Sequence, residues 1–427
     1  MKSATPARGL APVRQLLDNG AVVIAKRSDA TPAVTVHASF AAGSIYDPPG
    51  RAGLAQFVAK VIDRGTETHD GDQIAEQLED RGVSLNVIVN RHALQLVLTC
   101  LVEDLDPVLA TLADVVMHPT FPEGAVQQKR AELITQIRQD EDNPAAVAGE
   151  ASMAAVYGET HPYGSRPRGS VESVEAITRG DIQAFHAARV TPPTLSLVLV
   201  GDVEPGAAIA SAARAFGGWL GTPGGEVALA EPPEHQARTV RVIPMMNKSQ
   251  ADIAYGFAAV RRHDPEFYAF WLMNNILGQY SLGGRLGESI RERQGMAYYA
   301  FSGLDANVIR GPLVIRAGVA ADNVEKAVAS IDAELTKMAS EGPTDQEMNE
   351  SRQYLIGSMP RNLETNLGIA NFLQAEEFFQ LGLDYDLRVP GLLGAVTREQ
   401  VHAAARRVLD PSRAVVVVAG PYSRTLR

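Results

Sequence analysis

The sequence predicts an α+β protein of two tandem homologous domains, each a mixed, mostly antiparallel sheet covered by helices. The first observation is internal repetition: ITRGDIQAFHAARVTPPTLSLVLVGDV, from Ile177, is matched 219 residues later by VTREQVHAAARRVLDPSRAVVVVAGP, from Val396. The second is that hairpin-like strand pairs interrupt the alternation of strands and helices, which argues against a doubly wound parallel sheet. The third is a segment rich in Gly and Pro between the two copies, without helical or strand periodicity.

The repeated segments have the same expected local structure in both copies. Thr178 and Thr397 are expected N-caps, each followed by an amphipathic helix, a break containing proline and an apolar strand ending in glycine. Helices of about 12 to 20 residues are expected between the strands. An alternating strand at residues 34–40 corresponds to one at 253–257, and hairpins are expected from residues 83–89 with 93–101 and from 298–303 with 311–319.

These repeats divide the chain into two domains joined by a linker. We expect the first domain at residues 10–220 and the second at residues 237–427. The linker, GTPGGEVALAEPPEHQ at residues 221–236, lies between them. A chain of 427 residues is long enough for two cores of ordinary size.

Composition excludes several classes of protein. A net charge of −11 argues against nucleic-acid binding, which requires concentrated Lys and Arg. The single cysteine, Cys100, excludes an internal disulfide, and its apolar surroundings predict a buried, inert thiol. No apolar run approaches the ~20 residues of a membrane span, and the N-terminus has no apolar segment typical of a secretory signal. We therefore expect a cytoplasmic location.

A short helix is predicted from about Gly53. The preceding Asp47-Pro48-Pro49-Gly50 has the composition of a turn. Five apolar residues follow with the spacing of a buried helical stripe, namely Leu54, Phe57, Val58, Val61 and Ile62. Gln56 and Lys60 are four residues apart, so their side chains stack on another face of this helix.

This stretch resembles the pitrilysin (insulinase) family of zinc peptidases, which includes the mitochondrial processing peptidase and the respiratory-chain core proteins. Active members carry the inverted motif H-x-x-E-H, in which two His bind Zn²⁺ and the Glu is the general base. The residues in register with the family pattern are Gly43-Ser44, Asp47, Gly53-Leu54-Ala55, Phe57 and Gly65-Thr66. The resemblance extends over nearly the whole chain, from about Leu17 to Gly420.

The positions that carry the family's chemistry are replaced. The three motif positions are Gln56, Ala59 and Lys60, and the position of the third ligand, a Glu on a later helix, is Gln136. Glutamine is a weak zinc ligand and alanine cannot accept a proton from water. The ammonium of Lys60 would repel a dication by about 8 kcal/mol at ~4 Å and an effective dielectric constant of ~20. We therefore expect no metal or cofactor on this chain, and a solvated polar helix face is the simplest interpretation of Gln56 and Lys60.

The second copy keeps residues that the family uses on the substrate. In LGESIRERQGMAYYAFSG, residues 286–303, Arg291 and Tyr298 have the family's spacing of seven for an Arg and a Tyr that reach the bound peptide and the oxyanion. The resemblance implies that Arg291, at a helix end, and Tyr298, opening the next strand, bind substrate. Tyr299 is the rival for the tyrosine position.

The resemblance is compatible with three functions. The first is a non-catalytic subunit of a heterodimeric zinc endopeptidase, as in bacterial members of the family in which one chain bears H-x-x-E-H and the other bears the Arg and Tyr. Its partners would be that homologous catalytic chain, which holds the zinc, and a peptide substrate. The second is a structural or peptide-binding protein without hydrolytic activity. The third, an independent peptidase with a rebuilt site, has no supporting residues.

Overall fold

The computed structural model describes residues 9–222, 224–225, 227–279 and 284–426. The chain forms two compact units, which are described separately. Unit 1 comprises Met1–Ile137, Arg166–Ala228 and Pro360–Leu387, and unit 2 comprises Arg138–Ser165, Leu229–Met359 and Arg388–Arg427. Each unit is therefore built around one copy of the repeat, with one segment from the other half of the sequence.

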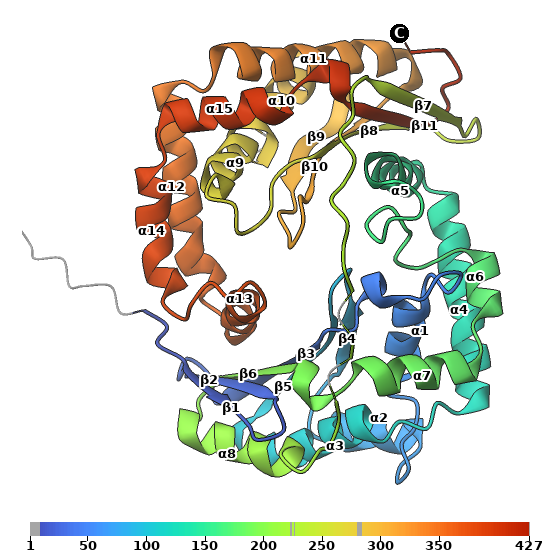
Figure 1. The fold of residues 1–427 in the computed structure, drawn as a ribbon, viewed down its shortest axis with the longest axis vertical. Coiled ribbons are helices and arrows are strands. Elements are labelled where there is room, and N and C mark those ends of the chain that lie inside the picture. Colours follow the sequence, from blue (N-terminus) through green and yellow to red (C-terminus); the bar gives the residue numbers. More distant parts are fainter. Residues whose placement is uncertain (1–8, 223, 226, 280–283, 427) are drawn as a thin grey trace, which may run out of the picture. The chain divides into compact units, whose positions relative to one another are not determined.

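The sheet of unit 1 has six strands in the order β1-β2-β6-β3-β5-β4 (Figure 1). Only β2 and β6 are parallel; the other neighbours are antiparallel. The strands are β1 (Val13–Leu16), β2 (Val22–Arg27), β3 (Ala33–Phe40), β4 (Asn86–Val89), β5 (Leu94–Leu101) and β6 (Leu195–Gly201).

The sheet of unit 2 has five strands in the order β7-β11-β8-β10-β9, and only β7 and β11 are parallel. This order and these directions repeat those of β2-β6-β3-β5-β4, which confirms the predicted fold class and the duplication. The strands are β7 (Thr239–Pro244), β8 (Ala251–Ala258), β9 (Ala297–Leu304), β10 (Pro312–Val319) and β11 (Val415–Gly420).

The N-caps predicted in the repeat are confirmed. Thr178 and Thr397 each accept a hydrogen bond from the backbone N–H three residues on, which satisfies a donor that the first helical turn leaves open. The predicted helix lengths were partly wrong, because several helices are shorter than 12 residues where turns end them early. The helices are α1 (Leu54–Val61), α2 (Gly71–Glu79), α3 (Leu105–Met117), α4 (Glu123–Glu141), α5 (Pro144–Tyr157), α6 (Val171–Ala176), α7 (Arg179–Arg189), α8 (Pro205–Phe216), α9 (Phe267–Asn274), α10 (Gly284–Leu286), α11 (Val324–Glu341), α12 (Asp345–Asn362), α13 (Asn366–Phe378), α14 (Tyr385–Ala395) and α15 (Arg398–Val408).

Both faces of the sheet in unit 1 are covered. Alternate residues of the strands pack with α1, α2, α3, α7 and α8 in the main core. The opposite face, including Ile24, Val198 and Val200, packs against α13 from late in the sequence. The amide of Gln374 on α13 donates to the carbonyl oxygens of His37 and Ser196, at 2.7 and 2.9 Å.

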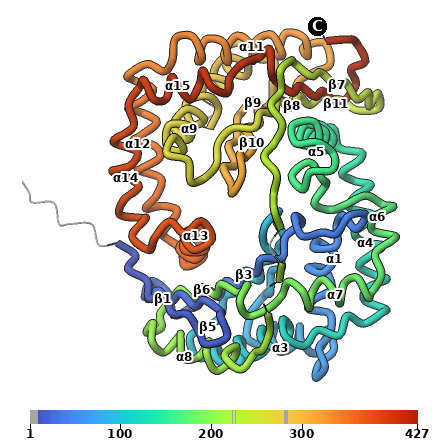
Figure 2. Tube along the Cα trace, in the orientation of Figure 1, coloured from blue at the N-terminus to red at the C-terminus, as the bar shows by residue number. Residues whose placement is uncertain are grey.

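The sheet of unit 2 is covered in the corresponding way by α5, from the first half of the sequence (Figure 2). Gly256 on β8 makes this approach possible, because a Cβ there would lie 2.6 Å from both the Ser152 hydroxyl and a Val156 methyl group. The other face meets α11, where the hydroxyl of Tyr255 contacts Asp332 at 3.1 Å.

The described residues of the predicted linker, 221–236, contain no helix or strand. Among the helices that the structure describes, none combines the length and the apolar composition needed to cross a membrane. The first eight residues, part of the N-terminal segment in which no secretory signal is expected, lie outside the described chain.

Candidate functional site

Helix α1 is held by the residues that match the family pattern. The carboxylate of Asp47 accepts hydrogen bonds from the backbone N–H groups of Gly53 and Ala55, both at 2.8 Å, and so caps the helix. Gly53 has a φ of 93°, and a Cβ there would lie 2.5 Å from the Arg168 carbonyl oxygen. The Thr66 hydroxyl donates to Asp114 at 2.7 Å just beyond the helix. These matched residues therefore build the scaffold.

The predicted core stripe of α1 is confirmed, because all five of its apolar side chains are at most 1% exposed. Ala59 is also buried, with 5% of its surface exposed. Gln56 and Lys60 are half-buried, and neither side chain makes a hydrogen bond or ion pair within the part of the chain that the structure describes. The polar face predicted for this helix is therefore only partly solvated.

Helix α4 packs beside α1 and carries the fourth replaced position. The Arg130 guanidinium of α4 lies 5.1 Å from the centre of the Phe57 ring of α1. Gln136, also on α4, is half-buried and makes no hydrogen bond to other described residues. One turn earlier, Glu132 forms an ion pair with Lys129 at 2.8 Å. The neighbourhood of α1 and α4 is thus occupied by amides and charged pairs.

The described residues contain no group of three or more His, Cys, Asp or Glu side chains that could hold a metal ion. Gln56, Ala59 and Lys60 do not fit zinc in any case, since together they offer one weak neutral donor and one cation. Cys100 is buried on β5, and burial raises the pKa of its thiol to about 12, so it is not a nucleophile.

In the second copy, Arg291 lies near the end of a π-helical segment, Gly287–Arg293. Its guanidinium contacts the Glu292 carboxylate, with Nη2 and Nε at 2.7 and 2.8 Å. The side chain is 27% exposed, so this pair is available for exchange with another carboxylate or carbonyl.

Tyr298 is the second residue of β9, one residue later in the strand than expected. Its side chain is 87% exposed, at a register shift where β9 and β10 form a bulge opposite Gly318 and Val319. It forms no hydrogen bond or ring contact with other described residues, Arg291 included. The two predicted residues thus lie at either end of a short connection, residues 294–296, and do not contact each other.

Tyr299, the rival, is already engaged. Its hydroxyl donates to the carboxylate of Asp252, which is 3% exposed on β8. Burial and this hydrogen bond raise the pKa of Tyr299 above its usual value. The ring also lies against Gly318 and 5.7 Å from that of Phe301. The Asp252–Tyr299 pair has no precursor in local sequence patterns, because it joins residues far apart in the chain.

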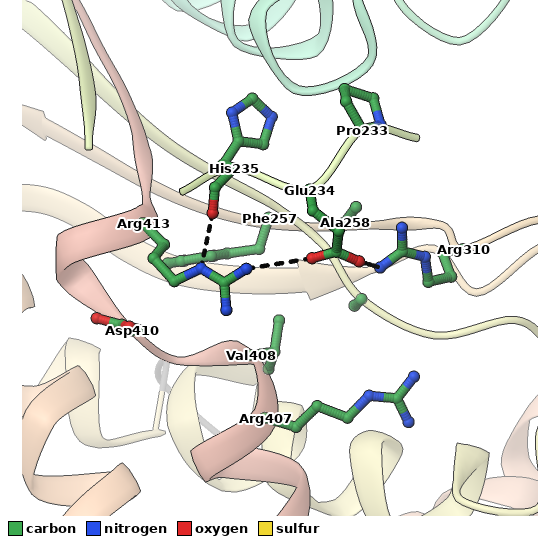
Figure 3. Close-up of a pocket in the computed structure, with 11 residues that line it drawn as sticks. Pro233, Glu234, His235, Phe257, Ala258, Arg310, Arg407, Val408, Asp410 and Arg413 are labelled. Carbon is green, nitrogen blue, oxygen red and sulfur yellow. Dashed lines mark hydrogen bonds and ion pairs between the residues drawn. The ribbon is translucent and has the colours of Figure 1, made fainter. Parts of the chain in front are cut away.

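A cavity of about 270 Å³ lies elsewhere in unit 2, where the end of the linker meets the sheet (Figure 3). Three arginines line it, but two linker carboxylates neutralise two of them: Glu234 contacts Arg413 at 3.2 Å and pairs with Arg310, which Glu231 also contacts at 3.1 Å. The carbonyl oxygen of His235 accepts from Arg413 at 2.7 Å. Arg407 pairs with Glu266. The cavity therefore serves to anchor the linker, and its charges are already matched.

Fold and site together define a tandem α+β protein of zinc-peptidase type whose metal positions are replaced. The model of the insulinase family (peptidase family M16) matches residues 22–165, and that of the peptidase M16 inactive domain matches residues 176–355. The chain belongs to the M16 peptidase family, as a member that lacks the zinc site. The predicted resemblance is confirmed.

Several relatives match along nearly their whole length. An uncharacterized zinc protease of Mycobacterium leprae is 26% identical over 98% of this chain and 93% of its own, and the zinc protease YmxG of Bacillus subtilis is 23% identical over 95% and 97%. A crystal structure of a peptidase M16 inactive domain from Pseudomonas fluorescens has a TM-score of 0.90 at 27% identity, covering 98% of this chain and 99% of that one. The first half of the periplasmic protease PqqL from Escherichia coli shares the fold, with a TM-score of 0.79 at 16% identity, over 98% and 93%.

Proposed function

We propose that this protein is the non-catalytic subunit of a heterodimeric zinc endopeptidase. A homologous partner chain bearing H-x-x-E-H supplies the zinc, the attacking water and the general base. This chain supplies part of the wall of a catalytic chamber that closes between the two chains, together with Arg291 and Tyr298 as donors to the bound peptide and the oxyanion. The observation that carries the proposal is selective loss: Gln56, Ala59 and Lys60 replace the chemical groups, whereas the scaffold around them is intact.

The free state of Tyr298 supports its assignment. A hydroxyl that is exposed and without a partner in the described chain can donate to a substrate carbonyl, whereas the Tyr299 hydroxyl would first have to leave a buried carboxylate. Arg291 gives up only a half-exposed contact with its neighbour when it binds substrate.

The edge of the first sheet supports binding of an extended peptide. Within the described part of the chain, strand β4 pairs with β5 alone, and α1 packs beside it. Its open backbone groups can accept an added strand, and Ile88, 50% exposed, offers an apolar contact. The net charge of −11 favours basic peptides over acidic ones.

The relatives also favour a role in proteolysis. Proteins named as zinc proteases match this chain from end to end, and in PqqL the same fold is one half of a longer protease. A fold that operates as one half of a protease in that protein can operate here as one of two chains.

The proposal is tested by isolating the tagged full chain from its native host and identifying the co-purifying proteins by mass spectrometry. A near-stoichiometric partner of similar size that carries H-x-x-E-H is expected. Recovery of the chain alone, or with unrelated proteins, contradicts the proposal and favours the alternative, a structural or peptide-binding protein whose open strand β4 binds peptides without hydrolysis.

With the pair in hand, Arg291→Ala is expected to lower its kcat by about 10²-fold, the usual cost of removing one oxyanion donor. Peptide hydrolysis by the reconstituted pair gives the measurement, and Arg293→Ala, in the same segment but 62% exposed, is the matched control. An unchanged rate for Arg291→Ala rules out its role.

A further inference from the structure

The polar face of α1 carries an ammonium group that no carboxylate of the described residues contacts. Lys60 lies one helical turn after Gln56, so the two side chains share that face. Both are half-buried, and neither has a hydrogen-bond or ion-pair partner among the residues described. A half-buried cation without a partner has lost part of its hydration without a compensating contact.

Two carboxylates lie near Lys60, and each is already in contact with another cation. The Arg64 Nε atom is 3.0 Å from the Asp63 Oδ1 atom, although without hydrogen-bond geometry. Burial raises the pKa of the Asp63 carboxyl, and the charges of Arg64, Lys129 and Lys60 act against that rise.

The second carboxylate, Glu132, receives two contacts from the Lys129 ammonium, at 2.8 and 3.0 Å. This hydrogen bond lowers the pKa of Glu132, and the charge of Lys60 adds to the effect from further away. Three cations therefore share two carboxylates. Lys60 is the surplus cation, close enough to be felt by both carboxylates and in contact with neither.

Helices α1 and α4 each add an amide donor of the kind that binds an anion with two oxygens. Gln56 offers an amide N–H₂ on the same face of α1, and Gln136 offers another on α4, one turn beyond Glu132. Helix α1 also packs beside β4, the strand whose outer edge is open. A peptide added to β4 would therefore extend alongside the helix that carries Lys60.

We propose that Lys60, with the amides of Gln56 and Gln136, forms a binding site for a carboxylate of the bound peptide, either its C-terminal α-carboxylate or an Asp or Glu side chain. The proposal rests on the proposed binding of peptides. It assigns the replaced metal positions a recognition role, in which an ammonium group binds an anion where active relatives bind a cation. A charge-assisted hydrogen bond in a half-buried place gives such a site its affinity.

The test uses the purified full chain and three fluorescein-labelled decapeptides of alternating Val and Lys. One ends in a free acid, one ends in an amide, and one ends in an amide but carries a single internal Glu. Fluorescence anisotropy gives the dissociation constant of each. The free-acid or the Glu peptide is expected to bind about tenfold more tightly than the plain amide, which is the ratio that about 1.4 kcal/mol provides. Which of the two gains affinity identifies the source of the carboxylate.

Variants separate charge from structure. Lys60→Met is expected to reduce that tenfold preference to about one while leaving affinity for the amide peptide unchanged, and Lys60→Arg keeps the preference. Lys326→Met, which removes an exposed lysine from α11, is the control and retains it. Circular dichroism and the melting temperature establish that each variant is folded.

Two outcomes would overturn the inference in distinguishable ways. Equal binding of all three peptides by the unmodified chain, or equal weakening of all three by Lys60→Met, would rule out the carboxylate site but not peptide binding. Failure of every peptide to bind at millimolar concentration would rule out both the carboxylate site and the peptide binding on which it rests.

Discussion

The replaced residues differ from zinc ligands in charge as well as in donor atoms. A glutamine in place of one histidine would weaken a metal site, but a lysine in place of the other adds repulsion that no rearrangement of neighbouring carboxylates relieves, because those carboxylates already have cations of their own. Lys60 is therefore the residue that decides the metal-binding properties of this helix.

The purified chain is therefore expected to carry no stoichiometric zinc after exposure to zinc and gel filtration. Restoring the four chemical positions, with Gln56→His, Ala59→Glu, Lys60→His and Gln136→Glu, is expected to give about one bound zinc per chain, since the scaffold of α1 is intact. Elemental analysis measures both. The triple variant that retains Lys60 is the control, and zinc bound by it at full occupancy would refute the decisive role of the lysine.

The two adjacent tyrosines provide a matched pair. Tyr298→Phe is expected to reduce kcat of the reconstituted pair by about tenfold or more, because it removes an exposed donor with no structural partner. Tyr299→Phe is expected to leave kcat nearly unchanged but to lower the melting temperature, because it strips a hydrogen bond from the buried Asp252. Steady-state kinetics and thermal melts distinguish them, and the reverse pattern would reassign the site to Tyr299.

Among the elements, α1 shows how closely a short helix can depend on one glycine. Gly53→Ala forces a side chain into the left-handed region and against the Arg168 carbonyl, so it is expected to cost at least about 1–3 kcal/mol. Urea denaturation measures the loss. Gly206→Ala on α8, where the added methyl meets nothing within 4 Å, is expected to stabilise by about 0.5–1 kcal/mol instead. Equal effects of the two changes would show that the φ of Gly53 is not limiting.

Elements with a strong local signal could be predicted from the sequence. The buried stripe of α1, the N-caps Thr178 and Thr397 and the two hairpins all depend on residues close together in the chain, and each is found. The π-helical turn that carries Arg291 was not predicted, because it differs from an α-helix by one residue per turn within the same apolar pattern.

The features that escaped prediction depend on distant contacts. Helix α5 is rich in alanine and has no pronounced apolar stripe, so its sequence does not indicate which sheet it covers. The pairing of Asp252 with Tyr299 and the anchoring of Glu234 between two arginines join segments that only the folded chain brings together. The sequence also does not indicate whether the hydroxyl of a candidate residue is already hydrogen-bonded within the chain. That difference distinguishes Tyr298 from Tyr299.

At the scale of the whole molecule, the buried His37 and His92 and the half-buried His186 connect stability to pH. Burial lowers the pKa of His37 and of His92 to about 4 and lowers that of His186 as well. As the pH falls through about 6.5, these imidazoles become protonated in the unfolded chain but stay neutral in the folded chain. Stability is therefore complete above about pH 6.5 and is lost as the pH falls towards 4, by about 1.4 kcal/mol per pH unit for each of His37 and His92, and His186 contributes in the same direction.

Denaturant unfolding between pH 7.5 and 4.5 measures this loss. His37→Gln is expected to reduce the slope of the unfolding free energy against pH by the contribution of one proton, about 1.4 kcal/mol per pH unit. Replacement of His69, which is exposed and paired with Asp114, is the control and leaves the contribution of the buried rings intact. A free energy of unfolding that stays level from pH 6.5 to 4.5 would be incompatible with neutral, buried imidazoles.

The crossing of α5 and α13 between the two halves of the sequence has a consequence for the origin of the chain. A polypeptide that ended at the linker would leave one face of its sheet bare, and its own helix would have no sheet of its own to cover. Two copies of the same polypeptide could exchange that helix reciprocally, so that each sheet is covered by the helix of the other copy, as in a domain-swapped homodimer. The present chain has the architecture of such a dimer after duplication and fusion of its gene, so that each half can lose residues that the other half retains.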